Sequence, residues 1–188
     1  MAFLTRLRNE TEGSALLEFA IVLPLLVVFI VGIYDFSGAF NQKQKIEQAA
    51  QLGAISAAAQ PMTDIDPLNS NPDSLQPAVD VIFNSLATAN VMPLQNQGSC
   101  KVPVAGVHGA KPLQWTYTIS GCPDDLTITI DRGWVPTIGR PPVPIGTAVT
   151  VSYPYHWKFN SVIQFLVPGA SYAPKTDLKE TSTVHNQM

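Results

Sequence analysis

The chain has 188 residues, enough for one ordinary domain and a membrane segment, and 46% of them are apolar. Only 13% are charged, well below the roughly 25% that is usual for soluble domains. The net charge is −3 and the lysines and arginines are scattered, which excludes the basic patch of a nucleic-acid-binding protein. The composition therefore points to a protein that is partly in contact with a membrane.

An uncharged stretch close to the N-terminus is the strongest pattern in the chain. Between Glu18 and Asp35 lie 16 consecutive residues without a charge. A helix over residues 19–38 would be about 30 Å long, which matches the hydrocarbon core of a bilayer. Arg6 and Arg8 precede it and favour a cytoplasmic N-terminus. The sequence therefore predicts a single-pass membrane protein whose remaining chain lies outside the cytoplasm.

Two residues of this stretch do not suit a plain anchor. Glu18 lies at the edge of the apolar run, where an unpaired carboxylate costs on the order of 2–3 kcal/mol. Pro24 removes one backbone hydrogen bond, which membrane helices tolerate. Glu18 either reaches the lipid headgroups or pairs with a cationic group, such as the N-terminal amine of a neighbouring subunit.

The residues around Glu18 resemble the processing site of type IV prepilins. They read Gly13-Ser14-Ala15-Leu16-Leu17-Glu18-Phe19-Ala20, followed by Ile21-Val22-Leu23-Pro24-Leu25-Leu26. The pattern E-F-A-x-x-L-P-L-L more narrowly resembles the TadE-like pseudopilins (minor pilins) of the tight-adherence (Tad/Flp pilus) system. That resemblance covers roughly residues 13–59. Members often carry a basic residue immediately before the glycine, where this chain has Glu12.

The resemblance implies a processing step and a set of partners. A prepilin peptidase would cleave after Gly13, so that Ser14 becomes the first residue and Glu18 the fifth. Glu18, Phe19 and Pro24 would then act in subunit assembly, with Glu18 meeting the freed ammonium of another subunit. The implied partners are the peptidase, other pilin-like subunits, an inner-membrane platform, a cytoplasmic ATPase and the lipid bilayer. The implied roles are pilus assembly, adhesion, surface colonisation and biofilm formation, none of them enzymatic.

The helical pattern continues beyond the apolar stretch. Small residues recur at every fourth position in two rows, which are Ala49, Gly53 and Ala57, and Ala50, Ala54 and Ala58. They form a flat face for close packing, which we interpret as packing within the chain. Pro61 ends the pattern. We therefore expect a leader over residues 1–13 and a helix over 14–60, roughly 70 Å long.

Residues 61–188 are predicted to form an exported α+β domain. After a polar linker at 61–76, apolar residues at helical spacing predict a short amphipathic helix over 77–89. Three segments then alternate apolar residues with threonine, serine or other residues, as half-buried strands do, and a fourth strand is expected at 178–184. The alternating apolar sets are Trp115, Tyr117 and Ile119; Leu126, Ile128 and Ile130; and Val149, Val151, Tyr153 and Tyr155. These segments predict a mostly antiparallel sheet with helices packed on one face, as in pilins.

Two further segments of this domain leave alternatives open. The apolar residues 159–167 are too few to span a bilayer, and we expect a core helix there rather than an exposed loop that meets a partner. Cys100 and Cys122 are either two free thiols or a disulfide. Export to an oxidising compartment would favour the disulfide.

No residue pattern points to catalysis, a metal or a cofactor. Phosphate-binding loops, HExxH, GxSxG and dinucleotide fingerprints are absent from the sequence. His108, His156 and His185 are far apart in sequence, and His156 is interpreted as part of an aromatic cluster. Paired aspartates are interpreted as parts of a turn at 124–125 and of a solvated linker at 64–66.

Two other functions fit parts of the sequence. Residues 1–39 read as a conventional signal peptide with a weak small-residue cleavage site at 37–39, which would leave a secreted or periplasmic binding protein. A signal-anchored membrane hydrolase would need catalytic groups that converge in the exported domain.

Overall fold

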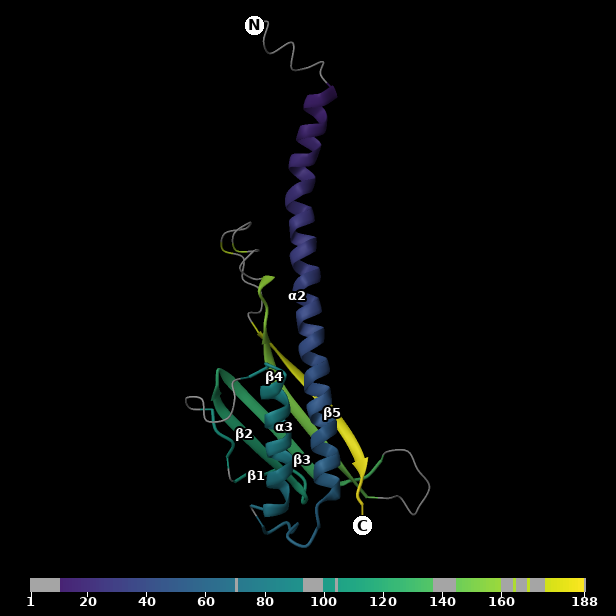
Figure 1. Ribbon diagram of the computed structural model, residues 1–188, viewed down its shortest axis with the longest axis vertical. Helices are drawn as coiled ribbons and strands as arrows, with labels where there is room; N and C mark the ends of the chain where they lie inside the picture. Colours follow the sequence, from purple (N-terminus) through teal and green to yellow (C-terminus); the bar gives the residue numbers. More distant parts are fainter. Residues whose placement is uncertain are drawn as a thin grey trace, which may run out of the picture. The chain divides into compact units, whose positions relative to one another are not determined.

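The computed structural model describes most of the chain as helix, strand and connecting segments. The described residues are 11–69, 71–92, 100–103, 105–136, 145–159, 164, 169 and 175–187. In chain order the elements are α2 (Thr11–Ala59), η1 (Asp73–Leu75), α3 (Gln76–Thr88), β1 (Val107–His108), β2 (Gln114–Cys122), β3 (Asp124–Trp134), β4 (Gly146–His156) and β5 (Lys175–His185) (Figure 1).

Helix α2 is one continuous element of 49 residues that contains Pro24. It confirms the predicted long helix, with bounds within three residues of those expected. The chain divides into two compact units, and α2 contributes to both. One unit contains Met1–Gly38 and Trp157–Pro174, and the other contains Ala39–His156 and Lys175–Met188.

The second unit is built on a five-stranded antiparallel sheet in the order β1-β2-β3-β4-β5. The strands pair with their neighbours in sequence, so the sheet is a simple meander. The predicted strand alternation is confirmed, because the apolar set of each predicted strand is buried. The fold is therefore α+β, as the sequence predicts.

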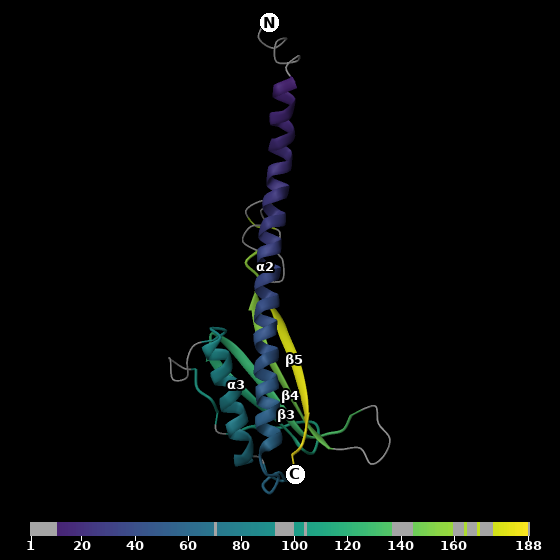
Figure 2. The ribbon, with the colours of Figure 1, turned by 45° about the vertical axis from the view of Figure 1, so that its right-hand side comes forward.

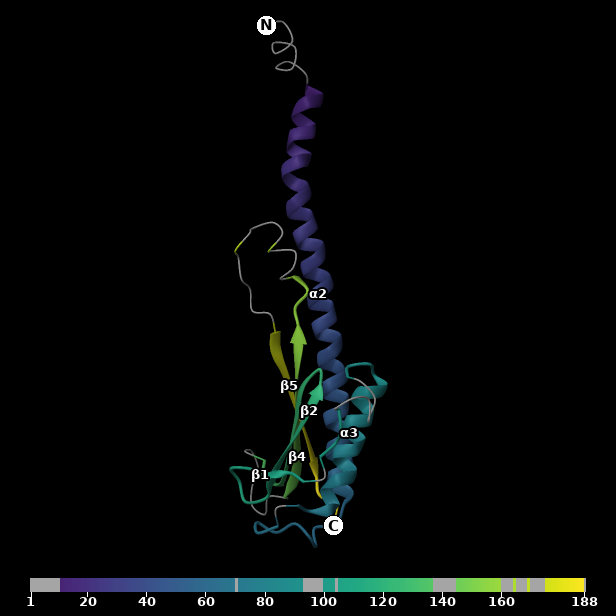
Figure 3. The same ribbon diagram turned by 90° about the vertical axis from the view of Figure 1, so that its left-hand side faces the viewer.

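The second half of α2 and α3 cover one face of this sheet (Figure 3). The α2 half lies over β4 and β5 (Figure 2), where Gln42 Nε2 donates to the Pro154 carbonyl at 3.2 Å and Lys43 Nζ lies 3.2 Å from Glu180 Oε1. Lys45 Nζ donates to the carbonyl of Ala89, just beyond the end of α3, at 2.8 Å. This bond satisfies a terminal carbonyl and ties the two helices together.

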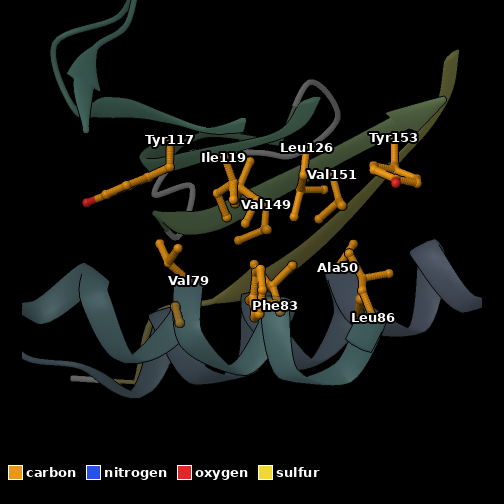
Figure 4. Packing of buried hydrophobic residues seen from close by; sticks show 14 of the residues in the cluster. Ala50, Val79, Phe83, Leu86, Tyr117, Ile119, Leu126, Val149, Val151 and Tyr153 are labelled. Carbon is orange, nitrogen blue, oxygen red and sulfur yellow. The ribbon is translucent and has the colours of Figure 1, made fainter. Parts of the chain in front are cut away.

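The core lies between the helices and the sheet. Val79, Phe83 and Leu86 of α3 point toward Ile119 of β2 and Val149 of β4 (Figure 4). The two rows of small residues on α2 are buried in the same layer, which confirms their use in packing within the chain. A Cβ at Gly53 would collide with the Ile82 side chain, so this glycine permits the close approach of α2 and α3.

Two predicted elements are confirmed only in part or lie largely outside the described residues. The final strand is longer than predicted, from Lys175 to His185, because its outer residues are polar and give no apolar alternation. The predicted core helix at 159–167 falls largely outside the described residues. Of that segment, Phe159 is half-buried and Gln164 is exposed.

Candidate functional site on helix α2

The N-terminal half of α2 presents a continuous apolar surface. Its most apolar 18-residue window has none of its residues buried. The exposed large side chains include Leu16, Leu17, Phe19, Ile21, Leu25, Phe29, Ile30 and Ile33. Each square ångström of such surface costs about 25 cal/mol in water, a cost that lipid removes. This helix is long and apolar enough to span a membrane.

The predicted processing and assembly residues lie at the start of this helix. Gly13 lies in the first turn of α2, and nothing lies within 4 Å of a Cβ built at this position. Ser14 and Glu18 are exposed and four residues apart, so they share one face of the helix. Phe19 is 62% exposed and Pro24 lies within the same apolar stretch. The structure brings these residues together on one bare helix segment.

Near its other end, the apolar stretch of α2 is contacted by three residues that follow β4. The Phe159 N–H donates to Asp35 Oδ2 at 2.8 Å, and Asp35 is only 1% exposed. The rings of Phe36 and Trp157 meet edge to face, with centroids 5.3 Å apart. These contacts were not predicted, since they join residues more than 120 positions apart in the sequence.

A buried polar cluster closes the opposite end of α2, in the sheet-containing unit. Arg132 on β3 is 1% exposed, and its Nη2 donates to the Gln60 carbonyl just beyond α2 at 2.8 Å. Burial lowers the pKa of Arg132, and the negative charge of Asp64 opposes that change. A cation at a helix C-terminus is favourable, so Arg132 stabilises the end of α2.

Asp64 and Tyr117 belong to the same cluster. Burial raises the pKa of Asp64, but the Ser74 N–H at 2.8 Å and the charge of Arg132 outweigh burial and leave this pKa below its usual value. Burial, helped by the charge of Asp64, raises the pKa of Tyr117 to about 12. Asp64 therefore contributes to a polar cluster from a half-buried position, while Asp66 is exposed, as expected for the solvated linker that the sequence predicts. The signal that was missed is Arg132, the only basic residue of β3.

His156, which the sequence analysis interprets as part of an aromatic cluster, pairs with an acidic residue in the structure. Its Nε2 lies 2.6 Å from Asp124 Oδ2, and Lys175 Nζ lies 3.9 Å from Asp124 Oδ1. The His156 and Lys175 side chains are more than half exposed, so solvent screens the pairs and their contribution to stability is small. Asp124 and Asp125 are the first residues of β3, so the prediction that they form a turn is wrong.

The described part of the chain contains no cluster of metal-ligating side chains. Within those residues, no three His, Cys, Asp or Glu side chains lie close enough together to hold a metal ion.

Cys100 and Cys122 are joined in a disulfide that closes a loop across 22 positions of the sequence. A bridge of this span stabilises a domain by roughly 3 kcal/mol, consistent with a structural role.

Comparison with known proteins gives one match. Residues 13–54 match the family model described as TadE-like protein. This segment lies within α2 and includes all five of the predicted processing and assembly residues, while the sheet lies outside it. The match confirms the resemblance noted in the sequence. No curated protein and no solved structure shows a significant match to the chain.

Proposed function

We propose that this chain is a membrane-anchored pseudopilin that acts in the assembly of a Tad-type (Flp) pilus. The observation that carries the proposal is that the TadE-like match coincides with a bare apolar helix bearing Glu18 near its start. Such a helix anchors the subunit in the inner membrane with the N-terminus cytoplasmic and the sheet domain outside. Its role is structural, in pilus assembly and the adhesion and biofilm formation that follow.

We further propose that a prepilin peptidase cleaves the chain after Gly13. The position is accessible, because nothing packs against it in the first turn of α2. A glycine weakens a helix by about 1 kcal/mol relative to alanine, which favours local unwinding for a peptidase. Cleavage frees the ammonium of Ser14, which can then pair with Glu18 of an adjacent subunit. Other pilin-like subunits and the inner-membrane platform are the partners this arrangement serves.

The mature N-terminus tests the processing step. We expect mass spectrometry of the native protein to find a chain that begins at Ser14. Gly13→Leu should block cleavage and leave a slower band on a gel. Gly32→Leu is the matched control, because Gly32 lies in the same helix and also has nothing within 4 Å of a built Cβ.

Other N-termini would contradict the proposal. A native chain that keeps residues 1–13 in cells with active peptidase would exclude processing at Gly13. A chain that begins at Phe40 would instead support the secreted or periplasmic binding protein.

A further inference from the structure

The three residues that follow β4 form a compact group with three consecutive residues of α2. Lys158 Nζ lies 5.8 Å from the centre of the Tyr34 ring, and Trp157 packs edge to face on Phe36. The Phe159 N–H binds Asp35 between them. The two short segments, residues 34–36 and 157–159, thus alternate aromatic and charged side chains at one place on the helix.

The depth of this group along α2 matches the edge of a bilayer. Asp35 follows Glu18 by 17 residues, or about 26 Å of helix, which approximates the thickness of the hydrocarbon core. If Glu18 marks the cytoplasmic boundary, residues 34–36 lie where hydrocarbon gives way to the outer headgroups. Tryptophan and tyrosine are enriched at that boundary, and lysine reaches from it to the headgroups.

The contacts of Asp35 and Phe159 suit this depth. A carboxylate next to hydrocarbon is costly unless it is hydrogen-bonded, and Asp35 is bonded to the backbone and almost fully buried. Phe159 lines an apolar groove on the membrane-facing part of the helix, with Val28, Phe29, Gly32, Ile33 and Phe36. The apolar surface of this group is therefore continuous with the proposed membrane span.

We propose that Trp157, Lys158 and Phe159 form a second membrane contact, which lies in the outer lipid interface beside the anchor helix. Trp157 and Phe159 enter the boundary between headgroups and acyl chains, and Lys158 faces anionic headgroups. This inference rests on the proposed membrane anchoring of α2. It adds that residues 157–159 themselves meet lipid, so the chain contacts the membrane at a second place besides the anchor helix.

Quenching of tryptophan fluorescence by brominated lipids tests the contact. The full chain is reconstituted in phosphatidylcholine vesicles whose lipids carry bromine either near the headgroup or near the end of the acyl chain. We expect quenching mainly by the shallow bromine, since Trp157 lies at the interface. Trp157→Phe should abolish this quenching, while Trp134→Phe, a change in β3, should leave it intact.

The role of Lys158 is tested by varying lipid charge. Adding phosphatidylglycerol to the vesicles should increase the shallow quenching in the native chain, and Lys158→Glu should remove that increase. Free inorganic phosphate should leave the quenching unchanged, which separates a lipid headgroup from a soluble anion.

The outcomes separate this inference from the proposed function. A chain that floats with vesicles and resists alkaline extraction, yet shows no bromine quenching, would overturn the lipid contact and leave the anchor intact. In that case, quenching of Trp157 by acrylamide in the vesicles would show that this side chain faces water. A chain that fails to float would overturn both.

Discussion

Glu18 is the acidic side chain at the start of the exposed apolar helix, on the same helix face as Ser14. After cleavage at Gly13, its carboxylate and the Ser14 ammonium would give every subunit both halves of an ion pair in a region of low dielectric. Such a pair is worth more there than in water, because solvent does not screen it. Within one helix, Ser14 and Glu18 can make only a weak contact. Each group therefore remains available to pair with its counterpart in another subunit.

Variants of Glu18 separate anchoring from assembly. Glu18→Leu should insert into the membrane at least as well as the native chain, because it removes a charge that costs about 2–3 kcal/mol in lipid. It should nevertheless fail to support pilus assembly, which electron microscopy and surface-adhesion assays would measure. Glu18→Asp keeps the charge and should retain part of the function. Normal assembly by Glu18→Leu would show that the carboxylate has no pairing role.

Tyr117 gives a second prediction at the residue scale. Its pKa is raised by burial to about 12 from an ordinary value of 10.0, so the folded state favours the protonated phenol. The unfolded chain loses this proton first as the pH rises, so the stabilisation is complete below pH 10 and is lost toward pH 12. The loss should amount to about 2 kcal/mol in the free energy of unfolding.

The control for this alkaline effect is Tyr117→Phe. The Tyr117 hydroxyl has no hydrogen-bond partner among the described residues, so this change removes the titrating group without breaking a bond. Urea unfolding of the detergent-solubilised chain should show a smaller loss of stability between roughly pH 10 and 12 in the variant. Tyr153, whose pKa burial also raises, remains in both proteins. Equal losses in the two would rule out the Tyr117 contribution.

At the scale of elements, Gly53 sets the distance between α2 and its neighbours. A side chain here meets Ile82 of α3 and lies 3.5 Å from Val149 Cγ1 of β4. Gly53→Leu should therefore lower the free energy of unfolding by about 2 kcal/mol, since overpacking outweighs the better helix propensity. Gln51→Leu, an exposed position on the same helix, should change it little. Equal stability of both variants in urea would contradict the close packing.

The elements themselves could largely be predicted, because their signals are local. Half-buried strands alternate in sequence. In α2, residues 41–48 join the apolar stretch to the rows of small residues, and they are good helix formers without a proline. Strand β1 was missed, since two residues cannot show a period. Two tertiary contacts made by α2 and its C-terminal end were beyond prediction for another reason. Arg132 reaches Gln60 and Phe159 reaches Asp35 across long stretches of chain, and such contacts leave no periodic trace.

At the scale of the whole molecule, the two halves of α2 are suited to different surroundings, lipid for the first half and protein for the second. Its first half exposes apolar side chains, while its second half buries small side chains against the sheet domain. That domain contains the Cys100–Cys122 disulfide. A disulfide persists in an oxidising compartment and is rare in the cytosol. The oxidation state of these cysteines therefore reports on which side of the membrane the sheet domain lies.

Thiol labelling should thus read out the proposed topology. When the protein of unchanged sequence is denatured, we expect neither cysteine to react with a bulky maleimide unless a reductant is added first. Leu25→Lys combined with Val28→Lys should block insertion, because each lysine costs about 3 kcal/mol at the centre of a membrane helix. The blocked chain should stay in the cytosol and take up two maleimides. Gln44→Lys with Gln51→Lys adds the same charge beyond the apolar stretch and should behave like the native chain. Two reactive thiols in the native protein would place the domain on the cytoplasmic side.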